Sequence, residues 1–438
     1  MSAPPSSPAI PSRTAEIRAV ARHDPQAAGR LLTALIRDLF SIPVADLRIN
    51  HDQYSLNSLN GFFTSAGREY FFKFHQEEGE EAMGGEYYRA DILSRAGLPV
   101  DQPVHISALP GEQLLIYDRR DDPRLSDVLF ALDQDHDDQA AARALRAEAD
   151  LNDHILAVAC ATLRPVTPDE AAAEPVHRLF HHRLVDLPGG HYPGGRLAAF
   201  YAGQDFAFPG GVVLNWNDIA MARPVINGAE HARSLLDMFD LAHGRYAPRN
   251  LADAGGITGH GDAHNANVWY RRGGDGLPDR LAFFDPAFAG DGVPALLAEI
   301  KPTFHNIFAH PFWLYHPDLA LRRFTASAAL RDGRLIIDTD WSPGPLREAL
   351  MEVKARHFWR PWLAHLSARG MLPPDWEDVI RIGLFLSPTL VMNLRAGAGR
   401  HNPVSSAVGL AVALAAGSAP VAGADIFSRF FDLIRPEE

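Results

Sequence analysis

The stretch GHGDAHNAN (residues 259–267) is the most informative part of this 438-residue sequence. It places glycine, acidic and amide residues between a helical pattern and the strand-like run Val268–Tyr270. A second apolar run, Leu281–Phe284, is followed at once by Asp285. A short hairpin between the two runs would bring Asp285 back beside Asn267. The sequence therefore predicts carboxylate and amide oxygens on neighbouring strand ends, and these are hard ligands that suit Mg²⁺.

Asp262 precedes Asn267 on the loop of the same stretch, where a carboxylate can meet a substrate hydroxyl. Phosphoryl transfer needs metal ligands that bridge phosphate oxygens, and a carboxylate that orients the nucleophile and accepts its proton. Taken alone, Asp262 would be more typical of a turn or a helix cap, and Asp285 of a strand-end turn before Pro286. Their intervals from Asn267 favour catalysis by Asp262 and metal binding by Asn267 and Asp285.

The pattern His260-Gly261-Asp262-x-His264-x-x-Asn267, with a later apolar run that ends in Asp285, resembles the aminoglycoside phosphotransferase and choline kinase family. The resemblance implies an α+β, two-lobed protein-kinase-like fold. Its N-lobe would be a small antiparallel sheet and its C-lobe large and mainly helical. The resemblance matches Asp262 to the catalytic aspartate, Asn267 to a metal-binding asparagine and Asp285 to the aspartate that chelates magnesium.

The first part of the chain carries short β-like runs, and a hairpin is predicted over residues 61–74. Lys73 lies near the end of the second run and resembles the lysine that contacts the nucleotide phosphates. Glu86 begins the next helical pattern and is the favoured ion-pair partner of Lys73, with Glu80 and Glu81 as alternatives. The resemblance thus implies a nucleotide site built in part from the N-lobe.

A predicted turn, Asn57–Gly61, stands where the family covers the phosphates, so Asn60 and Gly61 are expected to bind the nucleotide. The turn has one glycine and departs from the glycine-rich loop of protein kinases, which leaves its own phosphate contacts open. The last strand-like run of the small lobe ends at Tyr117. The resemblance then implies that the hinge that binds adenine through backbone hydrogen bonds lies near Ile116 to Arg119, so Ile116 and Tyr117 are expected to bind the nucleotide.

Composition excludes several other classes of protein. There are 41 Lys and Arg residues against 54 Asp and Glu, which gives a formal charge of -13 and argues against nucleic-acid binding. Cys160 is the only cysteine, so neither an intramolecular disulfide nor a multi-thiolate zinc site can form. We interpret Cys160 as a small buried hydrophobe. No stretch has the length and apolarity expected of a membrane span.

The Pro- and Ser-rich N-terminus does not resemble a signal peptide, and residues 1–20 are predicted to be a disordered arm. The N-lobe would span residues 21–118 and bind the nucleotide. The C-lobe would span residues 119–438 and hold the catalytic loop, the metal site and the acceptor site. Beyond about residue 300 the sequence predicts helices and loops. A cytoplasmic location is expected by default.

We therefore expect a phosphotransferase that uses ATP and Mg²⁺ to phosphorylate a hydroxyl of a small molecule. The acceptor classes left open are sugars, amino sugars, amino alcohols and aminoglycosides. Two alternatives are a catalytically inactive kinase-like binding or scaffold protein and an AMP transferase on the same fold. His305, His310 and His316 are interpreted as ordinary packing residues, with a wall of the acceptor pocket as the alternative.

Overall fold

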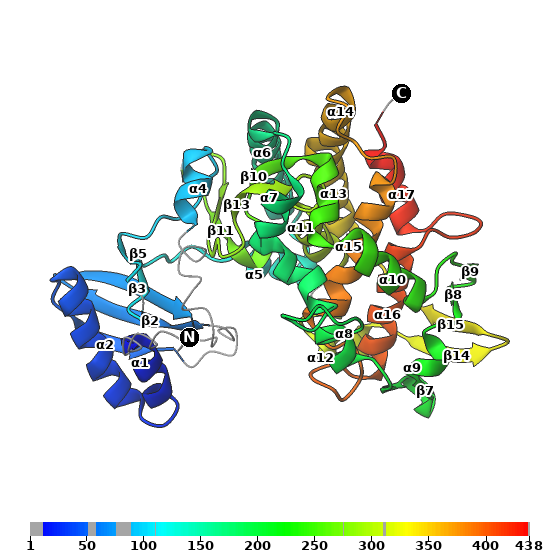
Figure 1. The fold of residues 1–438 in the computed structure, drawn as a ribbon, viewed down its shortest axis with the longest axis horizontal. Helices are drawn as coiled ribbons and strands as arrows, with labels where there is room; N and C mark the ends of the chain where they lie inside the picture. Colours follow the sequence, from blue (N-terminus) through cyan, green and yellow to red (C-terminus); the bar gives the residue numbers. More distant parts are fainter. Residues whose placement is uncertain are drawn as a thin grey trace, which may run out of the picture. The chain divides into compact units, whose positions relative to one another are not determined.

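The computed structural model describes residues 12–50, 58–75, 89–109, 111–274, 276–309 and 312–436. Its contacts divide the chain into two compact units. Unit 1 comprises residues 1–94 and 100–122, and unit 2 comprises residues 95–99 and 123–438. Unit 1 is built on an antiparallel sheet and unit 2 is mainly helical (Figure 1), which confirms the predicted α+β fold class.

Unit 1 contains a five-stranded sheet with the strand order β1-β2-β3-β5-β4, in which every neighbouring pair is antiparallel. Two helices precede the sheet in the chain and share its hydrophobic core. The described elements are α1 (Arg13–Ala21), α2 (Pro25–Phe40), β1 (Ala45–Ile49), β2 (Ser58–Ser65), β3 (Arg68–His75), α4 (Ala90–Arg95), β4 (His105–Ser107) and β5 (Leu114–Asp118).

Local sequence signals explain the two helices. Ser12 caps α1 by accepting a hydrogen bond from a backbone N–H of the first turn, and Ile17 of this helix is buried in the core. Asp24 caps α2 in the same way, and Pro25 stands at the first helical position. The disorder predicted for residues 13–20 is therefore wrong, because a capped helix with a buried isoleucine occupies them.

The β2–β3 hairpin lies where the sequence predicts it, with the turn at Ala66 and Gly67. The predicted turn over residues 57–61 is wrong in its described part, because β2 begins at residue 58. Asn60 and Gly61 are instead strand residues, and Asn60 pairs with Lys73 in the ladder. Gly61 is required for packing, since a Cβ there would lie 2.0 Å from a backbone oxygen of β1.

Unit 2 surrounds a few short strand pairs with helices. Its described helices of regular α type are α5 (Leu125–Gln134), α6 (Asp138–Thr162), α7 (Pro168–Ala173), α8 (Gly195–Phe200), α9 (Trp216–Ile219), α10 (Leu235–Arg245), α11 (Ile300–Thr303), α12 (Pro317–Arg323), α13 (Pro345–Lys354), α14 (Arg360–Ala368), α15 (Trp376–Val391), α16 (Pro403–Gly417) and α17 (Ile426–Ile434). α15 packs against α10, α11 and α16, and α6 packs against α13 (Figure 1). None of the helices in the described ranges combines the length and apolarity that a membrane crossing requires.

Two strand pairs position the informative stretch of sequence. β10 (Gly256–Gly259) leads into it and pairs with β13 (Gly290–Pro294), while β11 (Val268–Arg271) follows it and pairs with β12 (Arg280–Phe283). Both pairs are antiparallel. The predicted hairpin after residue 267 is therefore confirmed.

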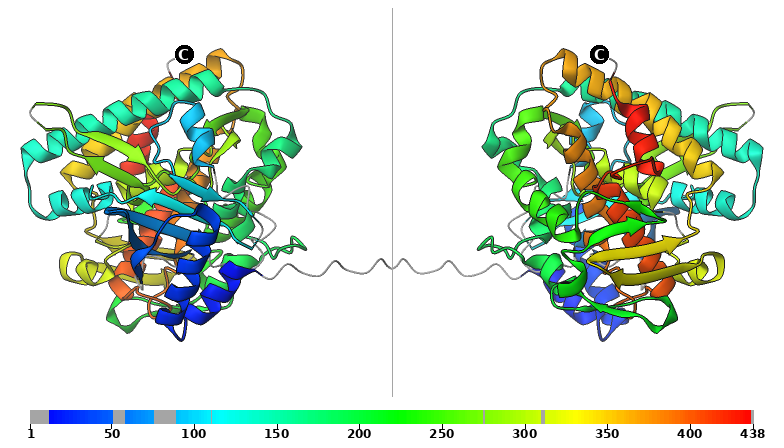
Figure 2. Two further views of the ribbon diagram at one scale, coloured as in Figure 1. Left: turned by 90° about the vertical axis from the view of Figure 1, so that its left-hand side faces the viewer. Right: turned by 90° about the vertical axis from the view of Figure 1, so that its right-hand side faces the viewer.

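The late part of the chain departs from the prediction of helices and loops alone. A hairpin of β14 (Ala326–Arg331) and β15 (Arg334–Thr339) joins β8 (Arg223–Ile226) and β9 (Ala229–Glu230) in a four-stranded sheet. This sheet packs against α16 (Figure 2). A further short pair joins β6 (Asp205–Ala207) to β7 (Val213–Asn215).

Candidate active site

The loop that carries Asp262 begins with a backbone turn that only glycine adopts easily. Gly261 has a φ of +75°, and a Cβ at this position would lie 2.6 Å from the backbone oxygen of Phe288. The chain can therefore pass close to the segment after Asp285 only because residue 261 lacks a side chain. The turn presents Asp262 directly after β10, with 8% of the residue exposed.

His260 joins the loop to the end of β12. Its Nδ1 accepts the Asp262 N–H at 3.3 Å, and Nε2 lies 3.0 Å from the backbone oxygen of Phe284. Because Nδ1 accepts, Nε2 carries the proton and donates to that oxygen. Burial lowers the pKa of His260, which keeps the ring in this neutral form. The His260 ring therefore joins Asp262 to Phe284, the residue before Asp285.

Asn267 closes the loop from its other end. Its Nδ2 donates to the backbone oxygen of Asp262 at 2.9 Å, and its own backbone oxygen accepts the Phe284 N–H at 3.0 Å. Asp285 follows immediately, with a φ of +55°, in the left-handed region that non-glycine residues rarely adopt. The charges of Asp262 and Asp285 both act on His260 and on His264. The structure thus brings Asp262, Asn267 and Asp285 into one neighbourhood of unit 2; their roles stay predictions.

The side-chain oxygens of Asn267 and Asp285 are of the kind that Mg²⁺ prefers as ligands. The hydrogen bond from Nδ2 of Asn267 uses the amide nitrogen, so the amide oxygen Oδ1 could serve as a neutral ligand. Asp285 adds a carboxylate and is only half-buried. No group of three or more His, Cys, Asp or Glu side chains within the described ranges could hold a metal ion. Two oxygen ligands nevertheless suit Mg²⁺, which keeps several waters and binds substrate phosphates.

A lysine from a distant segment pairs with Asp262. Lys301 of α11 places Nζ 2.5 Å from Oδ1 of Asp262, and only 8% of the lysine side chain is exposed. Burial lowers the pKa of Lys301, while the Asp262 charge opposes this shift. The ammonium group compensates a carboxylate that would otherwise be buried without a countercharge. Sequence reasoning missed Lys301, although a single lysine soon after the apolar run Ala295–Ala298 was a usable signal.

Two histidines and a tyrosine extend this buried polar group. Nε2 of His264 lies 3.6 Å from Oδ1 of Asp262, and the His264 ring lies 5.5 Å from the ring of His305. Burial lowers the pKa of His264 to about 4 and that of His305 well below its usual value. Nδ1 of His305 is hydrogen-bonded to the hydroxyl of Tyr315. His305 therefore belongs to the surroundings of Asp262, whereas His316 stacks on Phe130 and His310 lies outside the described residues.

A second set of residues braces the loop from outside. The side-chain oxygen of Asn306 accepts the Asn265 N–H at 2.7 Å, and its backbone oxygen accepts Nη1 of Arg347 at 2.6 Å. Arg347 also forms a buried ion pair with Asp133 of α5, at 2.6 Å. Asn306 and Arg347 lie in segments without a recognisable motif, so sequence reasoning did not find them.

The residues predicted to bind the nucleotide from the N-lobe lie in unit 1. Lys73 is half-buried on β3 and faces Asn60 and Leu115 in the ladders to β2 and β5. Ile116 is fully buried, and its backbone oxygen accepts the Val104 N–H at 2.7 Å. Tyr117 follows it on β5 and is half-buried. Glu86 lies outside the described residues, and the nucleotide roles of Lys73, Asn60, Gly61, Ile116 and Tyr117 remain predictions.

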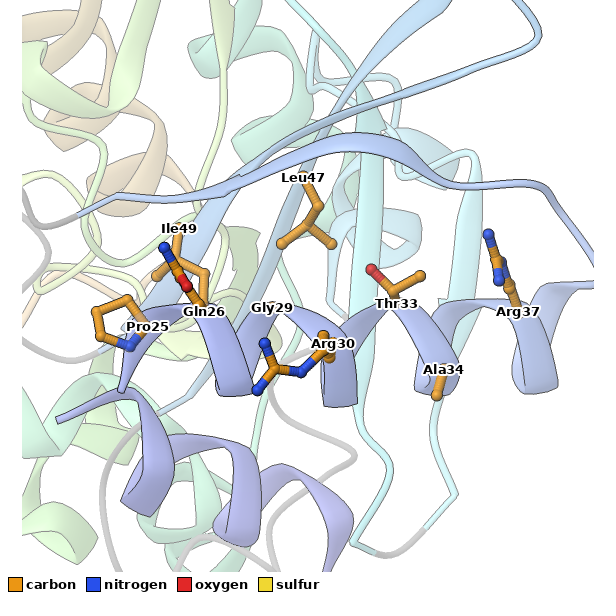
Figure 3. A pocket seen from close by; sticks show the side chains of 9 residues that line it. All are labelled: Pro25, Gln26, Gly29, Arg30, Thr33, Ala34, Arg37, Leu47 and Ile49. Carbon is orange, nitrogen blue, oxygen red and sulfur yellow. The ribbon is translucent and has the colours of Figure 1, made fainter. Parts of the chain in front are cut away.

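Unit 1 also has an open groove between α2 and β1 (Figure 3). Nine residues line it, none of which is a predicted site residue: Pro25, Gln26, Gly29, Arg30, Thr33, Ala34, Arg37, Leu47 and Ile49. The lining has two arginines and no carboxylate, so it offers neither a general base nor a negatively charged ligand for Mg²⁺. We therefore place the candidate active site at Asp262 and not in this groove.

Comparison with known proteins gives matches in structure only. No protein-family model matches the chain, and no curated protein sequence matches it. The chain is similar to a thermostable mutant of the aminoglycoside phosphotransferase APH(4)-Ia in complex with ADP and hygromycin B, with 15% identity, a TM-score of 0.45, and coverage of 89% of this chain and 99% of the other.

Two further structures are similar over most of their length. The spectinomycin phosphotransferase APH(9)-Ia, in complex with ADP and spectinomycin, has 9% identity and a TM-score of 0.35, with 88% of this chain and 98% of the other covered. An ethanolamine kinase of Plasmodium vivax has 11% identity and a TM-score of 0.32, with 91% and 86% covered. These are proteins of the kind that the sequence resemblance names.

Proposed function

We propose that this chain is a small-molecule kinase that transfers the γ-phosphoryl group of ATP, in the presence of Mg²⁺, to a hydroxyl of its acceptor. The observation that carries the proposal is the loop closed by Asn267 on the backbone of Asp262, with Asp285 at the adjoining strand end. This arrangement combines one buried carboxylate with two oxygen ligands that are more exposed. Such a division of roles is what phosphoryl transfer requires.

In the proposed reaction, Asp262 accepts a hydrogen bond from the acceptor hydroxyl and takes up its proton as the oxygen attacks the γ-phosphorus. The bond between that phosphorus and the bridging oxygen of ADP breaks, and ADP leaves. Asn267 and Asp285 would hold Mg²⁺, which when bound neutralises phosphate charge and orients the phosphates. His260 keeps Asp262 in place through its backbone N–H.

The test is to compare the wild type with Asp262→Asn and Asp262→Ala. ATP-dependent product formation should be lost in both variants, because neither side chain can accept the proton, while ATP binding should survive. Mass spectrometry of the product separates phosphate transfer from AMP transfer, since the added masses differ. Full activity of Asp262→Asn would refute the role of Asp262, and a wild type that neither binds nor hydrolyses ATP would favour the inactive binding protein.

A further inference from the structure

The two oxygens of the predicted catalytic carboxylate have different surroundings. Oδ1 of Asp262 is fully enclosed and lies 2.5 Å from Nζ of Lys301, but within the described ranges it has no partner with the geometry of a hydrogen bond. Oδ2 forms neither a hydrogen bond nor an ion pair with any residue that the structure describes. A buried acceptor without a hydrogen bond is unfavourable, so Oδ1 would gain from an N–H donor.

His264 holds such a donor beside this oxygen. Its Nδ1 accepts the Ala266 N–H at 3.3 Å, so the proton of the neutral ring is on Nε2. Nε2 lies 3.6 Å from Oδ1 of Asp262, slightly beyond the distance of a hydrogen bond. Only 16% of the His264 side chain and 11% of the Asp262 side chain are exposed. Hydrogen bonds in active sites are often long without substrate and shorten when it binds.

A buried segment supports the His264 ring. Residues Phe304–Phe308 form one turn of π-helix, a form that is rare and frequent at functional sites. The ring of His305 in this turn lies 5.5 Å from the His264 ring, at an interplanar angle of 38°. His305 is 2% exposed, and its Nδ1 is hydrogen-bonded to the hydroxyl of Tyr315. The support therefore limits the movement of His264 away from Asp262.

Capping alone would give His264 a purely structural role. The residue precedes the short turn Asn265–Asn267, and its bond to the Ala266 N–H caps that turn. This bond uses Nδ1 only, and it does not explain why Nε2 lies beside an enclosed oxygen of Asp262. The capping role and a role towards Asp262 depend on different nitrogens of one ring, so substitutions can separate them.

Resting on the proposed function, we propose that His264 is a positioning residue for phosphoryl transfer, whose Nε2–H closes on Oδ1 of Asp262 when the substrates bind. Lys301 holds the same oxygen from α11. Oδ2 is then left to accept the hydrogen bond of the acceptor hydroxyl and to take up its proton. Two partners on Oδ1 restrict the rotation of the carboxylate, and the rate of a bound reaction depends steeply on such orientation.

Two substitutions separate the nitrogens of His264. Asparagine can place an oxygen near the position of Nδ1 and keep the cap, whereas glutamine is longer and can place an N–H near the position of Nε2. His264→Gln should keep kcat within about threefold of the wild type, and His264→Asn should lower kcat about ten- to hundredfold, which is the scale for losing a side chain that orients a reacting group. The KM values for ATP and acceptor should change by less than about twofold, because the lost interaction forms fully only in the transition state.

Activity is measured with the full-length protein, ATP and Mg²⁺. Phosphate release reports transfer to water, and product mass reports transfer to glucose, glucosamine or ethanolamine. His357→Asn is the matched control, because Nδ1 of His357 also has a partner, Oδ1 of Asp153 at 2.9 Å, and neither residue belongs to the candidate site. The control should leave kcat unchanged. Equal kcat values for His264→Asn and His264→Gln, or a larger loss for His264→Gln, would overturn the inference and leave His264 as a cap.

Nitrogen-15 NMR of the histidine rings gives a readout besides activity. The His264 signals, identified by their absence from the spectrum of His264→Asn, should show the ring proton on Nε2. A proton on Nδ1 would overturn the inference. A wild type that transfers phosphate no faster than His264→Asn overturns only the role of His264. A wild type that neither binds nor hydrolyses ATP, and phosphorylates none of the acceptors, removes the proposed function as well.

Discussion

The ammonium nitrogen of Lys301 lies 2.5 Å from a carboxylate oxygen of Asp262, and both residues are less than a tenth exposed. The pair joins the Asp262 loop, which the sequence motif predicts, to α11, for which the sequence has no motif. It also gives the predicted catalytic carboxylate a fixed direction, because a short ion pair in a buried site permits little rotation.

Replacing Lys301 with Met should damage both stability and catalysis. Removal of one partner from a buried ion pair typically costs about 3–5 kcal/mol, because the other charge is left uncompensated. We expect kcat to fall roughly a hundredfold, which is the scale for losing one oriented polar group in an active site. Chemical denaturation and steady-state kinetics measure the two effects. The double variant Lys301→Met, Asp262→Asn should recover part of the lost stability; equal losses in the single and double variants would contradict the pairing.

Asp285→Asn should weaken the Mg²⁺ dependence of nucleotide binding without unfolding the chain. Asparagine tolerates the positive φ of this position and keeps an oxygen, but it removes the charge that attracts the metal. We expect the affinity for nucleotide in the presence of Mg²⁺ to fall roughly tenfold or more, with little change when Mg²⁺ is absent. Titration with a fluorescent ATP analogue gives both values. A variant with unaltered Mg²⁺ dependence would show that Asp285 is only a turn residue.

Gly261→Ala should displace the loop that presents Asp262. The left-handed backbone and the close approach to Phe288 both oppose a Cβ at this position, and strain of this kind costs about 1–3 kcal/mol. The loss of activity should be larger than the loss in the free energy of unfolding alone explains, since Asp262 is the next residue. Gly399→Ala is the control, because a Cβ at Gly399 meets nothing within 4 Å. If both variants lose the same activity, the turn at Gly261 does not position Asp262.

The part of the site that was predictable from the sequence is the part that is local in the chain. Asp262, Asn267 and Asp285 are joined by one loop and one hairpin, so spacing alone could place them together. Lys301 and Asn306 reach the loop through the packing of α11 and the segment after it, and no spacing rule reports such contacts.

The β14–β15 hairpin was missed for a different reason. Its turn contains Asp332 and Gly333, both with positive φ, and an Asp-Gly pair between two strand-like runs is a strong hairpin signal. The alanine-rich run before the turn reads as helix by propensity, so the tertiary contacts with β8 and α16 decided the outcome. The helix over residues 13–21 was missed because the Pro- and Ser-rich composition before it is typical of disorder. That composition ends at Ser12, which caps the helix.

Acid should destabilise this protein in part through His177, which is fully buried, with Nε2 2.7 Å from the backbone oxygen of Ala171. Burial lowers its pKa from 6.5 to about 4, and the nearby His182 and His181 add to this shift. Between these two pH values the unfolded chain binds more protons than the folded chain, so the free energy of unfolding falls as the pH is lowered from about 6.5 to about 4. Above that window the contribution of His177 to stability is fully present.

His177→Gln keeps a side-chain N–H for Ala171 and removes the titration. At about 1.4 kcal/mol per pKa unit, the wild type should lose up to about 3 kcal/mol more than the variant across this window. Urea unfolding at pH 8, 7, 5.5 and 4.5 measures the difference in the free energy of unfolding between the two proteins. This difference should stay constant between pH 8 and pH 7 and grow steadily below pH 7. Parallel curves for the two proteins from pH 7 to pH 4.5 would mean that His177 takes up its proton without unfolding, and would assign the acid sensitivity to other groups.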